Sequence, residues 1–326
     1  MERFDNWIPI RVDWQHSRPV VHWCRLGGLR FTEPFFDQTI NRALAHPANL
    51  LFQRQTPIEA LEQWAASQPG LTPTGFIFHM SRCGSTLISQ MLAVLPKNLV
   101  ISEARPLDAV LRSHFREAGI TETQRIGWLQ CMVSALGQRR HPEQKHFFIK
   151  FDSWHVLFLS LIRRAFPTVP WIFVYRQPME VLMSHWRQRG PQVIPGVLEA
   201  AMFGWDQPAV GAMSPEEYAA RVLAKFCEAA LESVQAGMGK LVNYQELPVI
   251  MLPTLMRFWG LEYSQADRLQ MLEASRLNAK NPSLPFEDDT ALKNRNIPDK
   301  LCAAVRQWLD DPYQQFEQMR IRGGVD

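Results

Sequence analysis

A short stretch of small residues, with one glycine and three hydroxyl side chains, interrupts an apolar segment near residue 80. The segment reads Gly75-Phe-Ile-Phe-His-Met-Ser-Arg-Cys-Gly-Ser-Thr-Leu87. Backbone N–H groups at the start of a helix are unpaired and carry the positive end of the helix dipole, so they attract oxyanions. Gly84 lets the backbone approach such a ligand closely. Arg82 adds a positive charge, and Ser85 and Thr86 add hydroxyl donors. The segment therefore predicts an anion-binding loop.

The residues on either side of this loop predict the elements that hold it. Phe76–Phe78 suits a buried strand. After the loop, apolar side chains recur three or four positions apart, which is typical of one face of a helix. These side chains are Leu87, Ile88, Met91, Leu92 and Leu95. The expected order is strand, loop, helix.

The loop lacks the lysine of nucleotide kinases and NTPases. Those proteins have Gly-Lys-(Ser/Thr), in which lysine binds the β- and γ-phosphates and the hydroxyl binds magnesium. Here the sequence is Gly84-Ser85-Thr86, and the basic residue is Arg82, two positions before the glycine. A P-loop kinase or nucleotide hydrolase is therefore the less favoured alternative.

A second strand that runs into a helix begins at Ile172. In Ile172-Phe-Val-Tyr-Arg-Gln-Pro, Arg176 ends the strand, and Pro178 stands where a first helical turn tolerates proline. Ser184 follows about two helical turns later. This pattern suits a second anion site, although a strand-end arginine that pairs with a surface carboxylate would look the same.

The two segments together resemble motifs of the P-loop sulfotransferase family. The first is similar to the family's 5′-phosphosulfate loop, Pro-(Lys/Arg)-Ser-Gly-(Thr/Ser)-Thr, with Ser81 and Cys83 in place of the common proline and serine. The second is similar to the 3′-phosphate motif, in which Arg176 and Ser184 would grip that phosphate. The resemblance implies the donor 3′-phosphoadenosine 5′-phosphosulfate and no metal. It implies donor contacts from Arg82, Cys83, Gly84, Ser85, Thr86, Leu87, Arg176, Ser184 and Tyr244.

The same resemblance nominates the catalytic residues Glu103, Lys150 and Arg82. Glu103 stands in the place of the base of tyrosylprotein and many bacterial sulfotransferases, and we expect burial to raise its basicity. Lys150 resembles the family lysine that touches the bridging oxygen, where charge grows in the transition state. Arg82 would act from the other side. Asp152 is the rival base, because cytosolic sulfotransferases place a catalytic histidine two residues after that lysine.

Two later segments resemble further parts of the donor site. Val242-Asn-Tyr-Gln-Glu-Leu247 is similar to the family's Tyr-Glu-Asp-Leu signature, which implies that Tyr244 lies against adenosine. The segment Asn278-Ala-Lys-Asn281 stands where family members close a loop over the nucleotide, so Lys280 is a candidate contact.

The alternation of short apolar runs with helical patterns predicts an α/β fold. We expect a P-loop three-layer sandwich with a central parallel sheet, helices on both faces and a largely helical C-terminal third. The expected strands are Phe76–Phe78, Leu99–Ile101, Phe147–Ile149, Ile172–Tyr175 and Leu241–Asn243. Residues 1–70 show no such alternation and are predicted to form an N-terminal extension or lid, with a helix capped by Thr32. The main domain would be 71–326.

Composition limits the partners and the compartment. The chain has 326 residues, with 35 basic against 32 acidic side chains and no polybasic run, which disfavours nucleic-acid and membrane partners. Five scattered cysteines form no CxxC pair, and residues 1–6 do not look like a signal peptide, so a cytoplasmic protein is expected. The expected partner is a small-molecule, peptide or glycan acceptor. A non-catalytic nucleotide-binding relative is the third alternative.

Overall fold

The computed structural model describes residues 6–285 and 297–322, and a five-stranded parallel sheet lies at its centre. Its strands are β4 (Gly75–His79), β5 (Asn98–Ser102), β6 (His146–Lys150), β7 (Trp171–Tyr175) and β8 (Gly239–Asn243). They lie in the order β5-β6-β4-β7-β8, and every neighbouring pair is parallel. All five predicted strands are confirmed.

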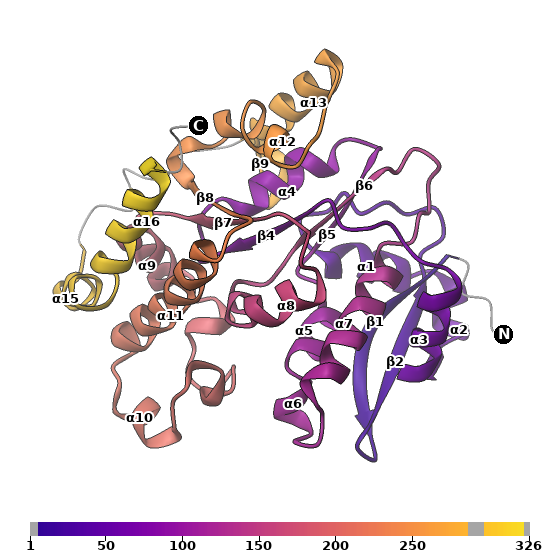
Figure 1. Ribbon diagram of the computed structural model, residues 1–326, viewed down its shortest axis with the longest axis horizontal. Helices are drawn as coiled ribbons and strands as arrows, with labels where there is room; N and C mark the ends of the chain where they lie inside the picture. The colour runs from indigo at the N-terminus through magenta and orange to yellow at the C-terminus, as the bar shows by residue number, and fades with distance from the viewer. Residues whose placement is uncertain (1–5, 286–296, 323–326) are drawn as a thin grey trace.

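Helices cover both faces of this sheet (Figure 1). On one side lie α4 (Ser85–Ala93), α12 (Leu255–Phe258) and α13 (Gln265–Ser275), and on the other α7 (Glu122–Leu136), α8 (Leu159–Ala165) and α11 (Pro215–Gln235). Further helices of the described chain after residue 100 are α5 (Arg105–Leu111), α6 (Ser113–Arg116), α9 (Pro178–Arg187), α10 (Gln207–Ala212), α15 (Asp299–Trp308) and α16 (Asp310–Arg322). The predicted α/β sandwich and the helical C-terminal third are confirmed, with a short hairpin of β9 (Leu277–Asn278) and β10 (Asn281–Pro285) added.

The central strands are apolar because both of their faces are covered. Every residue of β4, β5 and β7 is buried, as expected for a parallel sheet between two helical layers. Aromatic rings fill much of the space, and the Phe78 and Phe151 rings stack with centroids 4.7 Å apart. This rigid core holds the strand ends in place.

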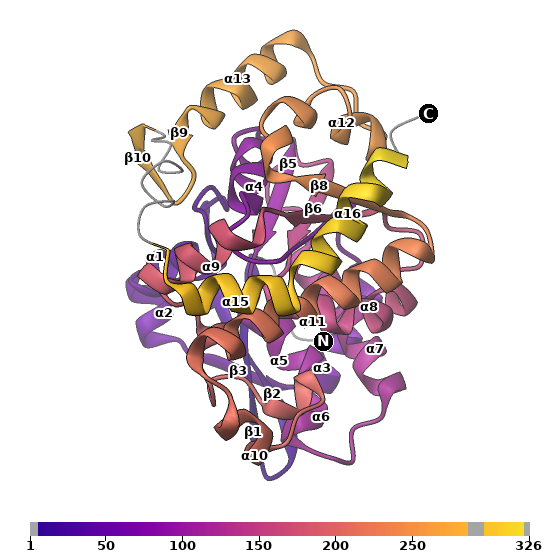
Figure 2. The same ribbon diagram turned by 90° about the vertical axis from the view of Figure 1, so that its left-hand side faces the viewer.

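Residues 7–67 form a unit that the sequence did not predict in detail. Three antiparallel strands, β1 (Trp7–Gln15), β2 (Arg18–Arg25) and β3 (Arg54–Pro57), pack with α1 (Phe36–Leu44), α2 (Pro47–Leu51) and α3 (Ile58–Ser67). Its helix α3 contacts α7, and β1 contacts α5 (Figure 2). The rings of Trp23 and Trp64 are buried and meet edge to face, so these tryptophans belong to the core. The role of this unit as a lid stays a prediction.

The prediction that Thr32 caps a helix is wrong. Helix α1 begins four residues later, at Phe36, and the side-chain oxygen of Gln38 accepts the backbone N–H of Phe35. Pro34 disfavours helical geometry at the residue before it, so no helix begins at Glu33, and residues 33–35 form a bend.

Candidate active site

The predicted site residues converge at the carboxyl edge of the parallel sheet. Arg82 lies in the loop after β4, Lys150 ends β6, and Glu103, Arg176 and Tyr244 directly follow β5, β7 and β8. Neighbouring strands lie about 4.8 Å apart. Because β4 lies between β6 and β7, the anion-binding loop has the lysine strand on one side and the Arg176 strand on the other.

The loop itself has the geometry of an anion-binding turn. Gly84 has a φ of 85° and directly precedes α4, whose first residues Ser85 and Thr86 are buried. Ser81 and Arg82 also have positive φ values, of 79° and 52°. Such turns direct successive backbone N–H groups toward one point, which suits a phosphate or sulfate group.

The side chains of the loop do not all face the same way. The Arg82 side chain is half-buried, and its Nη2 donates to the backbone oxygen of Gln188 at 2.8 Å. Cys83 is fully buried, its Sγ donates to the Val174 oxygen at 3.0 Å, and burial raises the pKa of its thiol to about 12. Leu87 is half-buried against the core. The predicted contact of Cys83 with the donor could therefore come only from its backbone.

The Tyr244 ring lies beside both Arg176 and Gly84, although 160 positions separate Gly84 from Tyr244 in the sequence. The Arg176 guanidinium lies 4.1 Å from the centre of the Tyr244 ring, and it forms an ion pair with Glu180. A Cβ added to Gly84 would lie 2.7 Å from Cδ2 of the same ring. Ser184 lies further along α9 and is half-buried. The structure thus brings the two predicted anion motifs to one place.

Lys150 and Glu103 form a partly buried ion pair. The Lys150 side chain is fully buried, and its Nζ contacts Glu103 Oε1. Burial alone would raise the pKa of Glu103, but the Lys150 ammonium and the nearby His79 hold it well below its usual range. We expected burial to make Glu103 more basic, and that expectation is wrong for the protein without ligand, because Lys150 stabilises the carboxylate.

His79 lies beside Glu103 and is hydrogen-bonded to the backbone on both sides of its ring. Its Nδ1 accepts the backbone N–H of Ser81 at 3.1 Å, and its Nε2 donates to the Phe151 oxygen at 3.1 Å. The ring is therefore neutral with its proton on Nε2, which also lies 3.6 Å from Glu103 Oε1. Burial lowers the pKa of His79 and keeps it in that state.

Asp152 belongs to a second buried network that the sequence did not reveal. Its backbone N–H donates to Nδ1 of the buried His155 at 3.3 Å, and His155 Nε2 lies 2.9 Å from Asp108 Oδ1. Burial and the charges of Glu103 and Asp108 raise the pKa of Asp152 well above its ordinary value. No sequence pattern links Asp108 to His155, because they come from separate elements.

The N-terminal unit also reaches this cluster. The Phe35 ring centre lies 5.3 Å from Lys150 Nζ, and the Asp37 carboxylate accepts from Arg105 Nε at 2.6 Å. Both residues directly flank the start of α1. No local pattern marks either residue, because their role depends on a contact between distant parts of the chain.

Lys280 extends the positive charge of the site. It lies between β9 and β10 and is exposed, but partial desolvation together with the charges of Arg82 and Lys150 lowers its pKa to about 8. Repulsion among these cations favours an anion between them. The described residues contain no group of three or more His, Cys, Asp or Glu side chains able to hold a metal ion.

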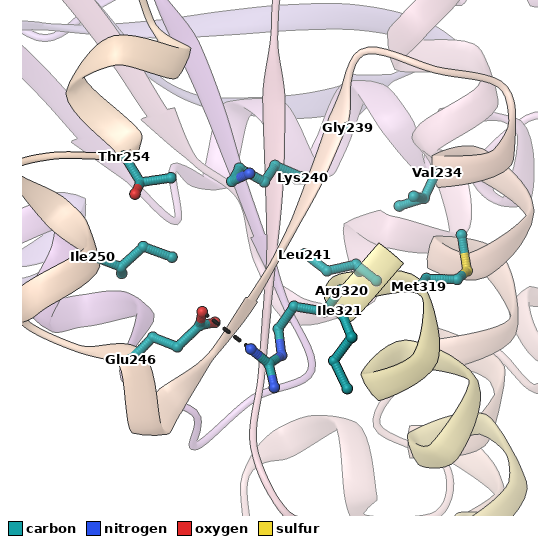
Figure 3. A pocket seen from close by; sticks show the side chains of 10 residues that line it. All are labelled: Val234, Gly239, Lys240, Leu241, Glu246, Ile250, Thr254, Met319, Arg320 and Ile321. Atoms are coloured by element: carbon teal, nitrogen blue, oxygen red, sulfur yellow. Dashed lines mark hydrogen bonds and ion pairs between the residues drawn. The ribbon is translucent and has the colours of Figure 1, made fainter. Parts of the chain in front are cut away.

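Two surface cavities are lined by other residues. One, of about 470 Å³, lies between β8 and α16 (Figure 3), and the other, of about 440 Å³, lies beside β1 and α5. Across the part of the chain that is described, no helix is both long and apolar enough to cross a membrane.

Comparisons with known proteins find similarity in structure. No protein-family profile matches the chain, and no curated protein matches its sequence. It resembles the sulfotransferase STF9 from Mycobacterium avium (13% identity over 78% of this chain and 81% of that one, TM-score 0.46). It also resembles the sulfotransferase domain of the Synechococcus PCC 7002 olefin synthase (16%, 77% and 95%, 0.44) and retinol dehydratase in a complex with retinol and PAP (12%, 81% and 87%, 0.37).

Proposed function

We propose that the protein transfers a sulfuryl group from 3′-phosphoadenosine 5′-phosphosulfate to a hydroxyl or amine of an acceptor. The observation that carries this proposal is that the Tyr244 ring, just after β8, lies beside both the Arg176 guanidinium, just after β7, and Gly84 in the loop after β4. Two separate anion sites bridged by an aromatic ring suit a nucleotide with phosphate groups at both ends. A kinase or nucleotide hydrolase is less well supported, because no lysine follows Gly84.

The residues present fit this donor. The loop N–H groups, with Ser85 and Thr86, would bind its 5′-phosphosulfate end, and Arg176 with Ser184 its 3′-phosphate. Tyr244 would lie against the adenosine. Arg82, Lys150 and Lys280 supply the positive charge that the sulfuryl oxygens and the leaving phosphate oxygen need, so fixed charge would carry much of the catalysis.

The transfer needs a base as well as positive charge. The acceptor oxygen or nitrogen attacks sulfur, the bond from sulfur to the phosphate oxygen breaks, and the acceptor's proton passes to Glu103. The Lys150 ammonium forms an ion pair with the Glu103 carboxylate, which makes that carboxylate a weaker base. A bridging oxygen that attracts Lys150 would weaken this ion pair and so make Glu103 a stronger base. Asp152 is the rival base, and its raised pKa keeps it protonated to higher pH than an ordinary carboxyl.

Isothermal titration calorimetry with adenosine 3′,5′-bisphosphate tests the proposal against ATP with magnesium. We expect tight binding of the bisphosphate and much weaker binding of ATP. Arg176→Ala should remove most of the bisphosphate affinity, while Arg306→Ala, which changes an exposed arginine on α15, should leave it intact. Equal or tighter binding of ATP would overturn the assignment.

A further inference from the structure

Helix α16 is bonded to the ends of the two strands that carry Arg176 and Tyr244. Glu317 Oε1 accepts the hydroxyl of Tyr175, the last residue of β7. The same oxygen accepts Asn243 Nδ2 at 2.8 Å, and Asn243 is the last residue of β8. One carboxylate from the C-terminal helix therefore joins two neighbouring strands at their carboxyl ends.

These bonds and the candidate donor contacts involve consecutive residues. Tyr175 and Asn243 are direct partners in the register of β7 and β8. Their side chains share one side of the sheet, where Glu317 binds both. Arg176 and Tyr244 are the first residues after the two strands, and there the guanidinium lies 4.1 Å from the ring centre. The separation of the first pair thus constrains the separation of the second.

Arg320, one turn further along α16, completes the connection. Its Nη2 donates to Glu317 Oε2 at 2.7 Å, and its Nε donates to the Tyr175 hydroxyl at 3.1 Å. Its Nη1 lies 3.3 Å from Glu246 Oε1, in the turn that follows β8 (Figure 3). Phe316 packs its ring on Tyr175, with centroids 4.8 Å apart. The helix therefore holds the strand ends through several bonds.

We propose that Glu317 is a positioning residue for the 3′-phosphate end of the donor site. It acts through Tyr175 and Asn243 on the spacing of Arg176 and Tyr244, and it touches no ligand itself. This inference rests on the proposed function. Glu317 lies after Asn278–Asn281, the last segment that resembles a family motif, so no motif pointed to it.

The bonds of Glu317 to Tyr175 and Asn243 predict a selective effect on ligand binding. If Glu317 sets the position of Arg176, replacement of Glu317 weakens the binding of nucleotides that have a 3′-phosphate and leaves the binding of nucleotides without one unchanged. Replacement of a residue that merely stabilised the fold would weaken the binding of both kinds of nucleotide alike.

The test compares two probes, adenosine 3′,5′-bisphosphate and adenosine 5′-monophosphate, by isothermal titration calorimetry on the full chain. In Glu317→Gln, three donors compete for one neutral carbonyl oxygen. We expect the bisphosphate Kd to rise about tenfold while the monophosphate Kd changes less than twofold. Asp311→Asn removes an exposed carboxylate of the same helix and should change neither.

A milder variant keeps the test decisive if Glu317→Gln does not fold. Tyr175→Phe removes only the hydroxyl that Glu317 accepts, and it should also reduce the preference for the bisphosphate. Equal losses for both probes, or no loss for either, would overturn the inference. A wild-type protein that does not prefer the bisphosphate would instead overturn the proposed function, so the two failures are distinguishable.

Discussion

Replacement of Gly84 by alanine tests whether the loop and Tyr244 form one site. Gly84 has a φ of 85°, and a Cβ at this position would lie 2.7 Å from Tyr244 Cδ2 and 3.0 Å from Leu247 Cδ1. The substitution therefore has two separate effects. It strains the backbone, and it pushes the ring that lies beside Arg176.

The sizes of these effects follow from the geometry. A left-handed conformation costs a residue with a Cβ about 1–2 kcal/mol. Carbon atoms in contact prefer about 3.5–4.0 Å, so the Tyr244 ring must move by about 1 Å. We expect the displaced ring to weaken adenosine 3′,5′-bisphosphate binding at least tenfold, which is about 1.4 kcal/mol.

Gly204→Ala is the matched control. Gly204 has a φ of 73°, but a Cβ there would meet no atom within 4 Å. Both variants should lose about 1–2 kcal/mol of stability through backbone strain, measured by thermal or urea unfolding. Only Gly84→Ala should lose bisphosphate affinity in calorimetry. A folded Gly84→Ala protein that binds the bisphosphate as tightly as the wild type would refute the placement of Gly84 and Tyr244 in the donor site.

Three further predictions concern the charged residues. Glu103→Gln should abolish transfer to any acceptor that the wild type uses, without weakening bisphosphate binding; retained turnover would move the base to Asp152. Burial and neighbouring carboxylates raise the pKa of Asp152 above its unfolded value of about 3.9, so its contribution to stability is complete below that value and is lost as pH rises through the folded pKa. Asp152→Asn should therefore lessen the fall in melting temperature as the pH rises above about 4, and parallel curves of melting temperature against pH for the two proteins would contradict this. Lys280 has a pKa of about 8, and bound phosphates should raise it. Calorimetry of bisphosphate binding at pH 8, in buffers of different ionisation enthalpy, should therefore show proton uptake that Lys280→Ala removes. Uptake that is unchanged in that variant would exclude Lys280 from the donor site.

The local elements were predictable because their signals are local. The apolar run before Gly84 and the helical spacing after it depend on neighbouring residues, so the strand, the loop and α4 follow from sequence. The same holds for β7, where Pro178 stands in the first turn of α9. Candidate residues at strand ends were predictable for the same reason.

Other features depend on contacts that no local pattern contains. The sequence did not predict the strands of residues 7–57, and it misplaced the start of α1. Burial alone predicted a more basic Glu103, whereas the Lys150 ammonium in contact with this carboxylate lowers its pKa. Phe35, which lies beside Lys150, comes from a part of the chain with no motif.

The amino-acid sequence by itself determined which residue types stand at each strand end, because strand and helix propensities act over a few residues. Only the tertiary structure decided which of those ends are neighbours. The order β5-β6-β4-β7-β8 places the loop between Lys150 and Arg176, and it sets Glu103 against Lys150. Charge interactions fall with distance, so the chemistry of these residues depends on that arrangement of strands.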